Sequence, residues 1–289
     1  MQLAVFSDGG PPRIGLVLRE GVVDISRRLP DAPDNMTELI RRWSALQPRL
    51  EAALRAGADL DIANLKLHPP VARPRKIFAI GLNYSDHCTE FGLDIPTDQI
   101  WFSKAVTAVN GPFDAIDLPA VSEELDYECE MVAVIGKRCR NVPRDRAAEV
   151  IFGYCVGNDV SVRDWQTRTS QWVLGKSFDT HAPIGPWITT ADDVDPQALD
   201  MRCYVNGEER QRTNTRYMVF DCYAQIECIT KALTLEPGDL VFTGTCGGVG
   251  ASYTPARWLR AGDVVRVEIS GLGAIENPVR AAQFTTIIE

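Results

Sequence analysis

The 289-residue sequence lacks long apolar runs, basic runs and closely paired cysteines, and each absence excludes a class of protein. No stretch approaches the roughly 20 uninterrupted apolar residues of a membrane helix. No Lys/Arg-rich run occurs and the net charge is −9, which argues against a nucleic-acid partner. The N-terminus has no basic segment followed by an apolar one, so no secretion signal is expected.

The eight cysteines are scattered and form no C-x-x-C motif. Without a secretion signal, they are predicted to be reduced structural thiols of a cytoplasmic protein. The same absence argues against a thiol-based redox protein. Cys88 follows His87 directly, but neighbouring residues of a helix point in different directions, so this pair is not expected to form a nucleophilic site. The content of 45% hydrophobic and 24% charged residues is ordinary for a globular enzyme or binding protein.

Gly/Pro turns and apolar patterns predict a small N-terminal α+β module over residues 1–72 and a larger domain over residues 73–289. In the module we expect short strands at 3–6, 14–18 and 22–25, and a helix at 35–54 that Pro48 kinks or splits. In the larger part, a helix is expected at 218–233 and strands at 76–80, 100–103, 130–135, 154–160, 187–190, 201–205, 240–243 and 264–269. This pattern predicts a β-rich α+β fold with a rolled, mixed sheet.

Two glutamates stand where a buried strand is expected to begin, in residues 126–136 (DYECEMVAVIG). Alternate strand side chains share a face, so Glu128 and Glu130 project together, about 7 Å apart along the chain. If this face is solvated, the pair has no special role. If it is buried, the two carboxylates need a positive partner, and a divalent cation is the simplest one. Asp159 ends the next apolar run, where it would cap a helix or add a third carboxylate to a Mg²⁺ or Mn²⁺ site.

His87 is one of only three histidines and stands in a short predicted helix ended by Gly92. Glu90 lies three residues later, on the same side of that helix, where it would orient the imidazole as a base. An exposed surface pair is the alternative. Lys176, in a polar segment at 175–180, is either solvated or placed to stabilise an oxyanion.

Three further residues are candidates to contact a substrate. Arg163 and Gln166 follow Asp159 and would line the same cleft. Thr245 lies in the glycine-rich segment 243–250 (TGTCGGVG) after a predicted strand. This segment matches neither a P-loop nor the dinucleotide-binding fingerprint, and a tight turn and a ligand-binding loop both remain open.

Five motifs in this order resemble the fumarylacetoacetate hydrolase family over roughly residues 73–280. They are residues 81–87 (GLNYSDH), 126–130 (DYECE), 158–166 (NDVSVRDWQ), 175–179 (GKSFD) and 243–245 (TGT). The resemblance implies a mixed β-roll fold, a Mg²⁺ or Mn²⁺ site, and a homodimer. It implies metal ligands at Glu128, Glu130 and Asp159, a base dyad at His87 and Glu90, and a catalytic lysine at Lys176. The residues expected to contact substrate are Gln166, Thr245, Tyr84 and Arg163.

Within that family the sequence looks most like the 2,4-diketo-3-deoxy-L-rhamnonate/L-fuconate hydrolase and acylpyruvate hydrolase branch. Residues 171–172 (QW), 183–187 (PIGPW) and 258–263 (WLRAGD) carry this likeness. Two positions depart from it. Cys246 replaces the proline usual after Thr-Gly-Thr, and His181 stands where a small or apolar residue is common. Both are expected to border the substrate pocket.

We therefore expect a metal-dependent hydrolase that cleaves a C–C bond of a 2,4-diketo acid (an acylpyruvate) to pyruvate and a carboxylic acid, in sugar-acid or aromatic catabolism. His87 would activate water, and Lys176 with Gln166 would stabilise the oxyanion. One rival is oxaloacetate decarboxylation or keto-acid isomerisation at the same metal site. Another is a catalytically silent binding protein of the same fold, although no predicted ligand or base position is missing.

Overall fold

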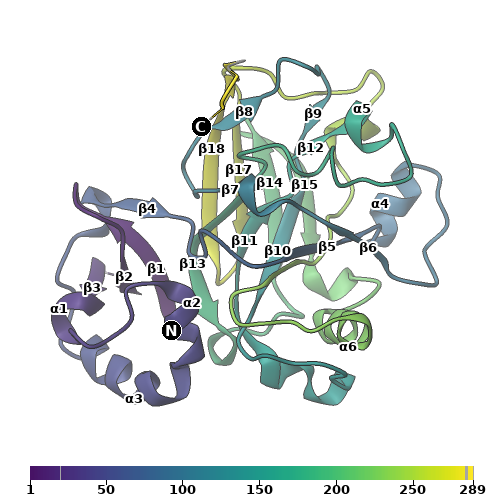
Figure 1. The fold of residues 1–289 in the computed structure, drawn as a ribbon. Coiled ribbons are helices and arrows are strands. Elements are labelled where there is room, and N and C mark those ends of the chain that lie inside the picture. Colours follow the sequence, from purple (N-terminus) through teal and green to yellow (C-terminus); the bar gives the residue numbers. More distant parts are fainter. Residues whose placement is uncertain (20, 284–285, 289) are drawn as a thin grey trace.

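A large mixed sheet, to which both the N-terminal and the central parts of the chain contribute, forms the framework of the protein. The structure is a computed structural model that describes residues 1–19, 21–283 and 286–288 (Figure 1). The strand order is β3-β2-β1-β13-β11-β10-β16-β5-β6, with β4 beside β1 and β7 beside β13. The strands are β1 (Gln2–Ser7), β2 (Arg13–Leu18), β3 (Gly21–Asp24), β4 (Lys66–His68), β5 (Ile77–Gly81), β6 (Ile100–Ser103), β7 (Val109–Asn110), β10 (Cys129–Ile135), β11 (Ile151–Asn158), β13 (Ala182–Thr190) and β16 (Leu240–Phe242).

A second sheet, in the order β15-β14-β17-β18-β8, packs against the first. Its strands are β8 (Ile116–Leu118), β14 (Asp200–Val205), β15 (Glu208–Asn214), β17 (Val264–Ile269) and β18 (Gly273–Ala281). The short strands β9 (Leu125–Asp126) and β12 (Ser161–Val162) form a separate antiparallel pair. Most pairs are antiparallel, but β16–β5, β13–β7 and β18–β8 are parallel, so the predicted mixed β-roll is confirmed.

The helices lie around the periphery of these sheets (Figure 1). They are α1 (Ile25–Arg28), α2 (Met36–Arg41), α3 (Trp43–Leu54), α4 (Ser85–Glu90), α5 (Arg163–Gln166) and α6 (Cys222–Ala232). Of these, α1, α2 and α3 lie beside the N-terminal strands. The 3₁₀ helices are η1 (Ile62–Asn64), η2 (Val106–Ala108), η3 (Arg144–Val150), η4 (Ala191–Asp193), η5 (Thr215–Tyr217) and η6 (Gly250–Ser252). Within the described part of the chain, no helix has the length and apolar character to cross a bilayer.

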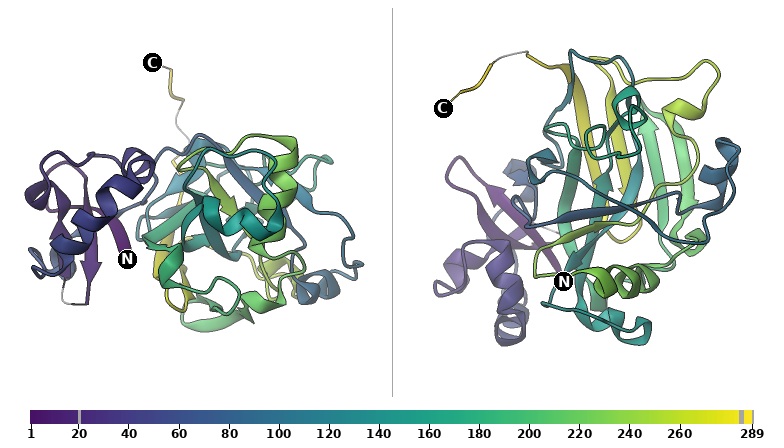
Figure 2. Two further views of the ribbon diagram at one scale, coloured as in Figure 1. Left: turned by 90° about the horizontal axis from the view of Figure 1, so that it is seen from below. Right: turned by 45° about the vertical axis from the view of Figure 1, so that its right-hand side comes forward.

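The N-terminal strands and helices form a lobe beside the larger body (Figure 2). The lobe is joined to that body through the sheet, because β1 pairs with β13 in the register Leu3↔Ile188. A shared apolar core backs this joint, with Leu39, Leu46 and Ile184 all fully or almost fully buried in it. The backbone pairing therefore crosses the boundary expected at residue 72, and a division there stays a prediction.

Strand β10 positions the carboxylates that the sequence motifs indicate as metal ligands. All seven of its residues are buried, because it lies between β11 and β16 in the middle of the sheet. Its register with β11 pairs Cys129 with Asn158, and the Asp159 N–H donates to the Glu128 carbonyl at 3.0 Å. This register brings the two glutamates of one strand end beside the aspartate that follows the next strand.

Several predicted elements have different limits in the structure. The helix expected at 35–54 is split at Arg42, which lies between α2 and α3, and not at Pro48, which lies inside α3. The helix expected at 218–233 starts only at Cys222, where the Asp221 side chain caps it by accepting from the Ala224 N–H. The other predicted strands correspond to observed ones, with ends shifted by a few residues.

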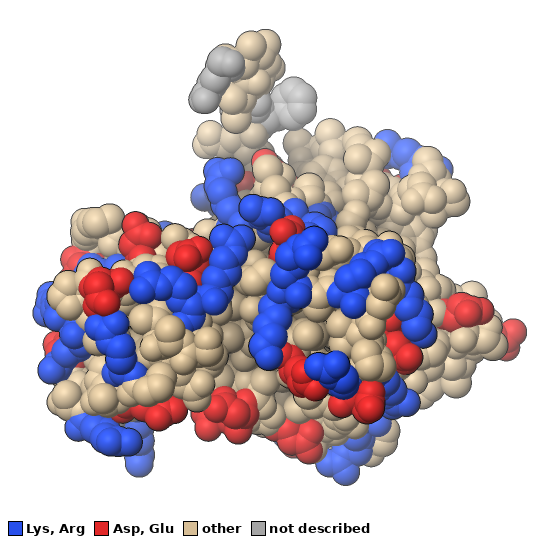
Figure 3. All heavy atoms as spheres, turned by 60° about the horizontal axis from the view of Figure 1, so that its bottom comes forward, with Lys and Arg blue, Asp and Glu red and all other residues tan. Residues whose placement is uncertain are grey.

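Charge of both signs is distributed over the surface. On the face shown in Figure 3, lysine and arginine side chains gather across the middle, and many of the aspartate and glutamate side chains lie along the lower edge. This mixture fits a chain with 30 basic and 39 acidic residues.

Candidate active site

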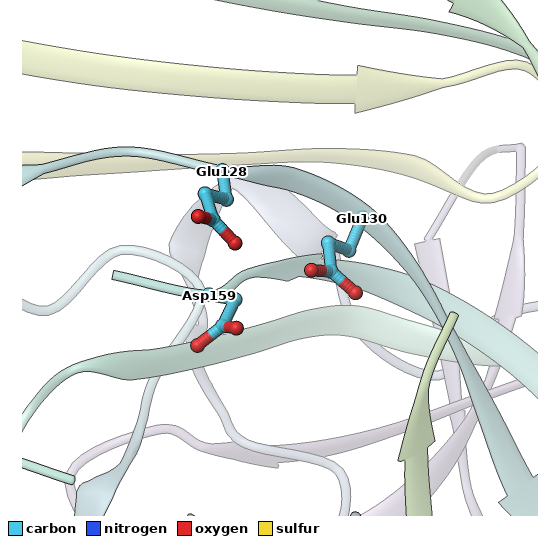
Figure 4. Close-up of side chains that lie close together, drawn as sticks. All are labelled: Glu128, Glu130 and Asp159. Carbon is cyan, nitrogen blue, oxygen red and sulfur yellow. The ribbon is translucent and has the colours of Figure 1, made fainter. Parts of the chain in front are cut away.

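Three buried carboxylates converge at the ends of β10 and β11 (Figure 4). One ligand oxygen each from Glu128, Glu130 and Asp159 lies within 4.8 Å of the others. The exposed fractions of the three residues are 4%, 1% and 0%. The solvated-face interpretation of the glutamate pair is therefore wrong. Oxygen donors in this number and spacing fit a hard divalent cation such as Mg²⁺ or Mn²⁺.

Cationic side chains surround this cluster. Lys176 Nζ donates to Glu128 Oε2 at 2.7 Å and to Asp159 Oδ2 at 2.9 Å. Lys104 Nζ binds the other oxygen of Asp159. Arg163 contacts Glu128 Oε1 at 2.7 Å from its opposite side. The lysine at position 176 is thus buried in the site and not solvated.

The pKa values differ strongly between the two glutamates. Burial would raise the pKa of Glu128, but Lys176 and Arg163 outweigh it and lower this pKa to about 2. Burial, reinforced by the negative charges of Asp159 and Glu128, raises the pKa of Glu130 well above its usual value. Glu130 makes no ion pair among the described residues and accepts one hydrogen bond, from Gly244 N–H at 2.7 Å. A divalent cation beside it would supply the missing positive charge.

The His87–Glu90 dyad is formed. His87 Nδ1 lies 2.6 Å from Glu90 Oε1, and Glu90 Oε2 accepts the Gly248 N–H at 2.7 Å. A carboxylate can only accept, so Nδ1 carries the proton and Nε2 is left as the base. His87 is only 6% exposed and lines a cavity, which excludes the surface-pair alternative.

Residues 243–249 contact both the carboxylate cluster and the dyad. The Gly244 N–H donates to Glu130 of the cluster, and the Gly248 N–H donates to Glu90 of the dyad. Gly248 has φ +99°, and a Cβ there would lie 2.0 Å from the Arg210 carbonyl oxygen, so a side chain is excluded. The Thr245 hydroxyl donates to the Cys129 carbonyl at 3.0 Å and accepts from Gln211 at 2.9 Å. Thr245 therefore has no hydroxyl proton left for a substrate.

A cavity of about 260 Å³ opens over His87 of the dyad and Glu128 of the carboxylate cluster. Its polar lining is made of His87, Glu128, Arg163, Gln166, Thr167, Lys176 and Thr245, of which all but Thr167 are predicted site residues. Gln166 Oε1 accepts from Arg163 at 2.9 Å, so its amide nitrogen is free to donate towards the cavity. Nine of the ten predicted site residues thus meet: six line the cavity, Glu90 reaches it through His87, and Glu130 and Asp159 adjoin it in the carboxylate cluster.

Three residues expected near the substrate lie elsewhere. Tyr84 is fully buried and its hydroxyl faces Met201 Sδ at 3.5 Å, so it does not line the cavity. His181 is buried with Nε2 2.8 Å from the Asp117 carbonyl oxygen, and burial lowers its pKa to about 4. Cys246 is also buried, and burial raises its pKa. Neither departure from the family pattern borders the cavity.

The structure adds two charged residues that the motifs did not single out. Lys104 is buried at the end of β6 against Asp159. Asp126 accepts from Arg163 Nε at 2.9 Å and from the Gly250 N–H at 2.7 Å, so it fixes the arginine and the following loop. For Lys104, the available sequence signal was a lysine directly after the apolar strand β6. No sequence signal linked Asp126 to Arg163.

Replacing Lys104 by methionine should destabilise the protein by about 2 kcal/mol, because a buried carboxylate oxygen of Asp159 loses its partner while Lys176 remains. Thermal unfolding should show a Tm lower by roughly 4–8 °C. Lys231→Met is the matched control, since Lys231 is 66% exposed and pairs only at the surface. Equal Tm values for the two variants would contradict a structural role for Lys104.

Comparison with known proteins identifies the family. The profile of the fumarylacetoacetate (FAA) hydrolase C-terminal family matches residues 76–280. The chain is 42% identical over 287 residues to oxaloacetate tautomerase fahd2, mitochondrial, of Xenopus laevis, covering 96% of this chain and 90% of the relative.

Two solved structures show the same fold. A maleylpyruvate hydrolase from Sphingobium sp. SYK-6, in complex with manganese(II) ion and pyruvate, is 37% identical with a TM-score of 0.83, covering 98% and 100% of the two chains. A 5-carboxymethyl-2-hydroxymuconate delta-isomerase from Mycobacterium smegmatis is 33% identical with a TM-score of 0.79 and the same coverage. The predicted resemblance is confirmed: the chain belongs to the fumarylacetoacetate hydrolase family.

Proposed function

We propose that this protein is a divalent-metal-dependent hydrolase that cleaves an acylpyruvate to pyruvate and a carboxylic acid. The observation that carries the proposal is one cavity lined by His87 of the His–Glu dyad, by the buried Lys176 and by Glu128 of the three-carboxylate cluster. Water activation needs the dyad, and oxyanion stabilisation needs the lysine. The SYK-6 maleylpyruvate hydrolase, solved with manganese and pyruvate, supports the metal and the product.

Glu128, Glu130 and Asp159 would hold the cation, Mg²⁺ or Mn²⁺. When bound, it supplies Lewis-acid polarisation and orientation of the 2-oxo acid half of the substrate. Five carboxylates, namely those of the cluster, the dyad and Asp126, stand against three buried cationic side chains, which leaves two negative charges for one divalent ion to balance. These charged groups are Glu90, Asp126, Glu128, Glu130, Asp159, Lys104, Arg163 and Lys176.

The proposed reaction begins when His87 Nε2 takes a proton from water, while Glu90 holds the imidazole through Nδ1. The water oxygen attacks the acyl carbonyl carbon, and Lys176 with the Gln166 amide donates to the oxyanion that forms. The bond between the acyl carbon and the methylene carbon then breaks. The acyl half leaves as a carboxylic acid, and the methylene carbon takes a proton to give pyruvate.

The second candidate is isomerisation or decarboxylation of oxaloacetate. The name of the Xenopus relative supports it, and a base at His87 could also move a proton between carbon and oxygen. The apolar side of the cavity weighs against it, because a small dianion would leave that wall unfilled.

A cytoplasmic location and a homodimer belong to the hydrolase proposal, although the Xenopus relative is named as mitochondrial.

Product analysis separates the candidates. Chelator-treated protein is incubated with acylpyruvates or oxaloacetate, with and without Mg²⁺ or Mn²⁺, and the products are followed by NMR. Metal-dependent pyruvate and carboxylic acid in equal amounts are expected from an acylpyruvate. The second candidate would replace the proposal if no acylpyruvate is cleaved and oxaloacetate is converted. The conversion would give either pyruvate with carbon dioxide or keto–enol exchange alone.

A further inference from the structure

The cavity has a polar floor and an apolar wall. The floor carries the dyad and the charged residues, and the wall is made of Ile80, Leu82, Phe91, Leu93, Phe102 and Trp172. The pyruvyl half of a substrate would lie on the floor, where the metal ligands are. The acyl substituent beyond the reacting carbonyl would then contact the wall.

The wall is built from closely packed rings. Trp172 packs against Gly81, where an added Cβ would lie 2.4 Å from the indole. Its ring meets Phe102 edge to face, with centroids 5.4 Å apart. On the other side Phe91 meets the His87 imidazole edge to face at 5.3 Å. Since aromatic packing of this kind fixes ring positions, the wall is a preformed apolar surface beside the base.

No cation is left to receive a second carboxylate on that wall. Of the described residues that line the cavity, His87, Arg163 and Lys176 are basic, and His87 serves as the base of the proposed reaction. Arg163 is held by Asp126 and Glu128, and Lys176 by Glu128 and Asp159. In the proposed reaction Lys176 serves the oxyanion. A carboxylate at the far end of the acyl group would therefore be buried against rings without a partner, which is strongly unfavourable.

The residues exposed at the cavity mouth are apolar, like those of the wall. Phe91 and Leu93 line the cavity and are still 41% and 50% exposed. The Leu93 N–H donates to the Cys88 carbonyl at 2.9 Å, which fixes this residue directly after the helix that carries His87. Large apolar side chains left exposed at a pocket mouth are typical of surfaces that an apolar ligand covers.

We infer that the substrate is an acylpyruvate whose acyl group is uncharged and apolar, and that the wall selects against a second carboxylate. This inference rests on the proposed function and narrows its substrates to acylpyruvates with an uncharged, apolar acyl group. It separates this chain from relatives named for oxaloacetate and maleylpyruvate, which are both dicarboxylates.

Two acylpyruvates of equal chain length test the inference: butanoylpyruvate, which is uncharged at its far end, and succinylpyruvate, which carries a carboxylate there. Pyruvate release by the Mn²⁺-loaded protein should give a kcat/KM at least about 50-fold higher for butanoylpyruvate, since an unpaired buried charge costs several kcal/mol. Equal values for the two compounds would overturn the inference and leave the proposed hydrolysis standing.

Variants at the cavity mouth provide the control. Leu93→Arg would supply the missing cation, so the preference should shift at least about 10-fold towards succinylpyruvate. Leu174→Arg adds the same charge at a residue that is 60% exposed and does not line the cavity, and it should leave the ratio unchanged. An equal shift in both variants would show a general charge effect and contradict selection by the wall.

Calorimetry distinguishes failure of the inference from failure of the proposed function. If neither compound yields pyruvate, the hydrolase proposal is wrong, and binding of the two compounds to the Mn²⁺-loaded protein decides the inference. Tighter binding of butanoylpyruvate would support an apolar acyl site. Equal or tighter binding of succinylpyruvate would overturn it.

Discussion

His87→Ala is expected to lower kcat for acylpyruvate hydrolysis by about 10²–10⁴-fold and to leave the Kd for Mn²⁺ within about twofold. The imidazole is the only base of the dyad that lines the cavity, and it makes no hydrogen bond to the three carboxylates. Steady-state kinetics gives the first quantity and calorimetric titration of chelator-treated protein the second.

Two companion variants make this result specific. Glu90→Gln keeps an oxygen for the Gly248 N–H but removes the charge that orients the imidazole, so an intermediate loss of kcat is expected. His68→Ala removes a histidine paired with Ser7 in the N-terminal part and should leave kcat unchanged. Parallel loss of metal binding and turnover in His87→Ala would contradict the separation of roles between base and metal ligands.

Glu130→Gln is expected to abolish metal-dependent turnover and to weaken Mn²⁺ binding on the order of 100-fold, because one of three anionic ligands becomes a neutral amide. The amide oxygen can still accept the Gly244 N–H, so the fold should be kept. Calorimetric titration measures the loss of affinity.

In the chelator-treated protein, Glu130→Gln is expected to stabilise the fold, although it weakens metal binding. Because the pKa of Glu130 is raised in the folded protein, its contribution to stability is complete below the ordinary glutamate pKa and is lost as pH rises towards the raised value. The variant has no such group, so its Tm should exceed that of the parent increasingly as the pH rises above the ordinary glutamate pKa of about 4.3. A lower Tm for Glu130→Gln throughout this range would show that the carboxylate is structurally required.

The parts of the fold that were predictable are those with strong local patterns. The apolar runs in β10 and β11 carry such patterns, and the structure confirms the strands predicted from them. Strand β15 (EERQRTN) was not predicted because only two of its seven residues are buried, so it has no apolar alternation. It owes its conformation to pairing with β14.

The site was predictable to the extent that its residues lie in short motifs. Glu128 and Glu130 share a strand face, and His87 and Glu90 share a helix face, so local geometry brings each pair together. Lys104 could not be assigned to Asp159, because 55 residues separate them and only tertiary packing joins them. The motif context placed Tyr84 near the substrate, but its ring follows the turn into the core.

The most direct test of the central claim follows the oxygen of the attacking water. Metal-loaded protein is incubated with butanoylpyruvate in water enriched in heavy oxygen, and the products are analysed by mass spectrometry. Hydrolysis by a His87-activated water predicts one heavy oxygen in each butanoate formed, and none in butanoate from metal-free or His87→Ala protein beyond the uncatalysed background. Keto–enol exchange of the acylpyruvate without any butanoate would contradict the account and identify the site as that of a tautomerase.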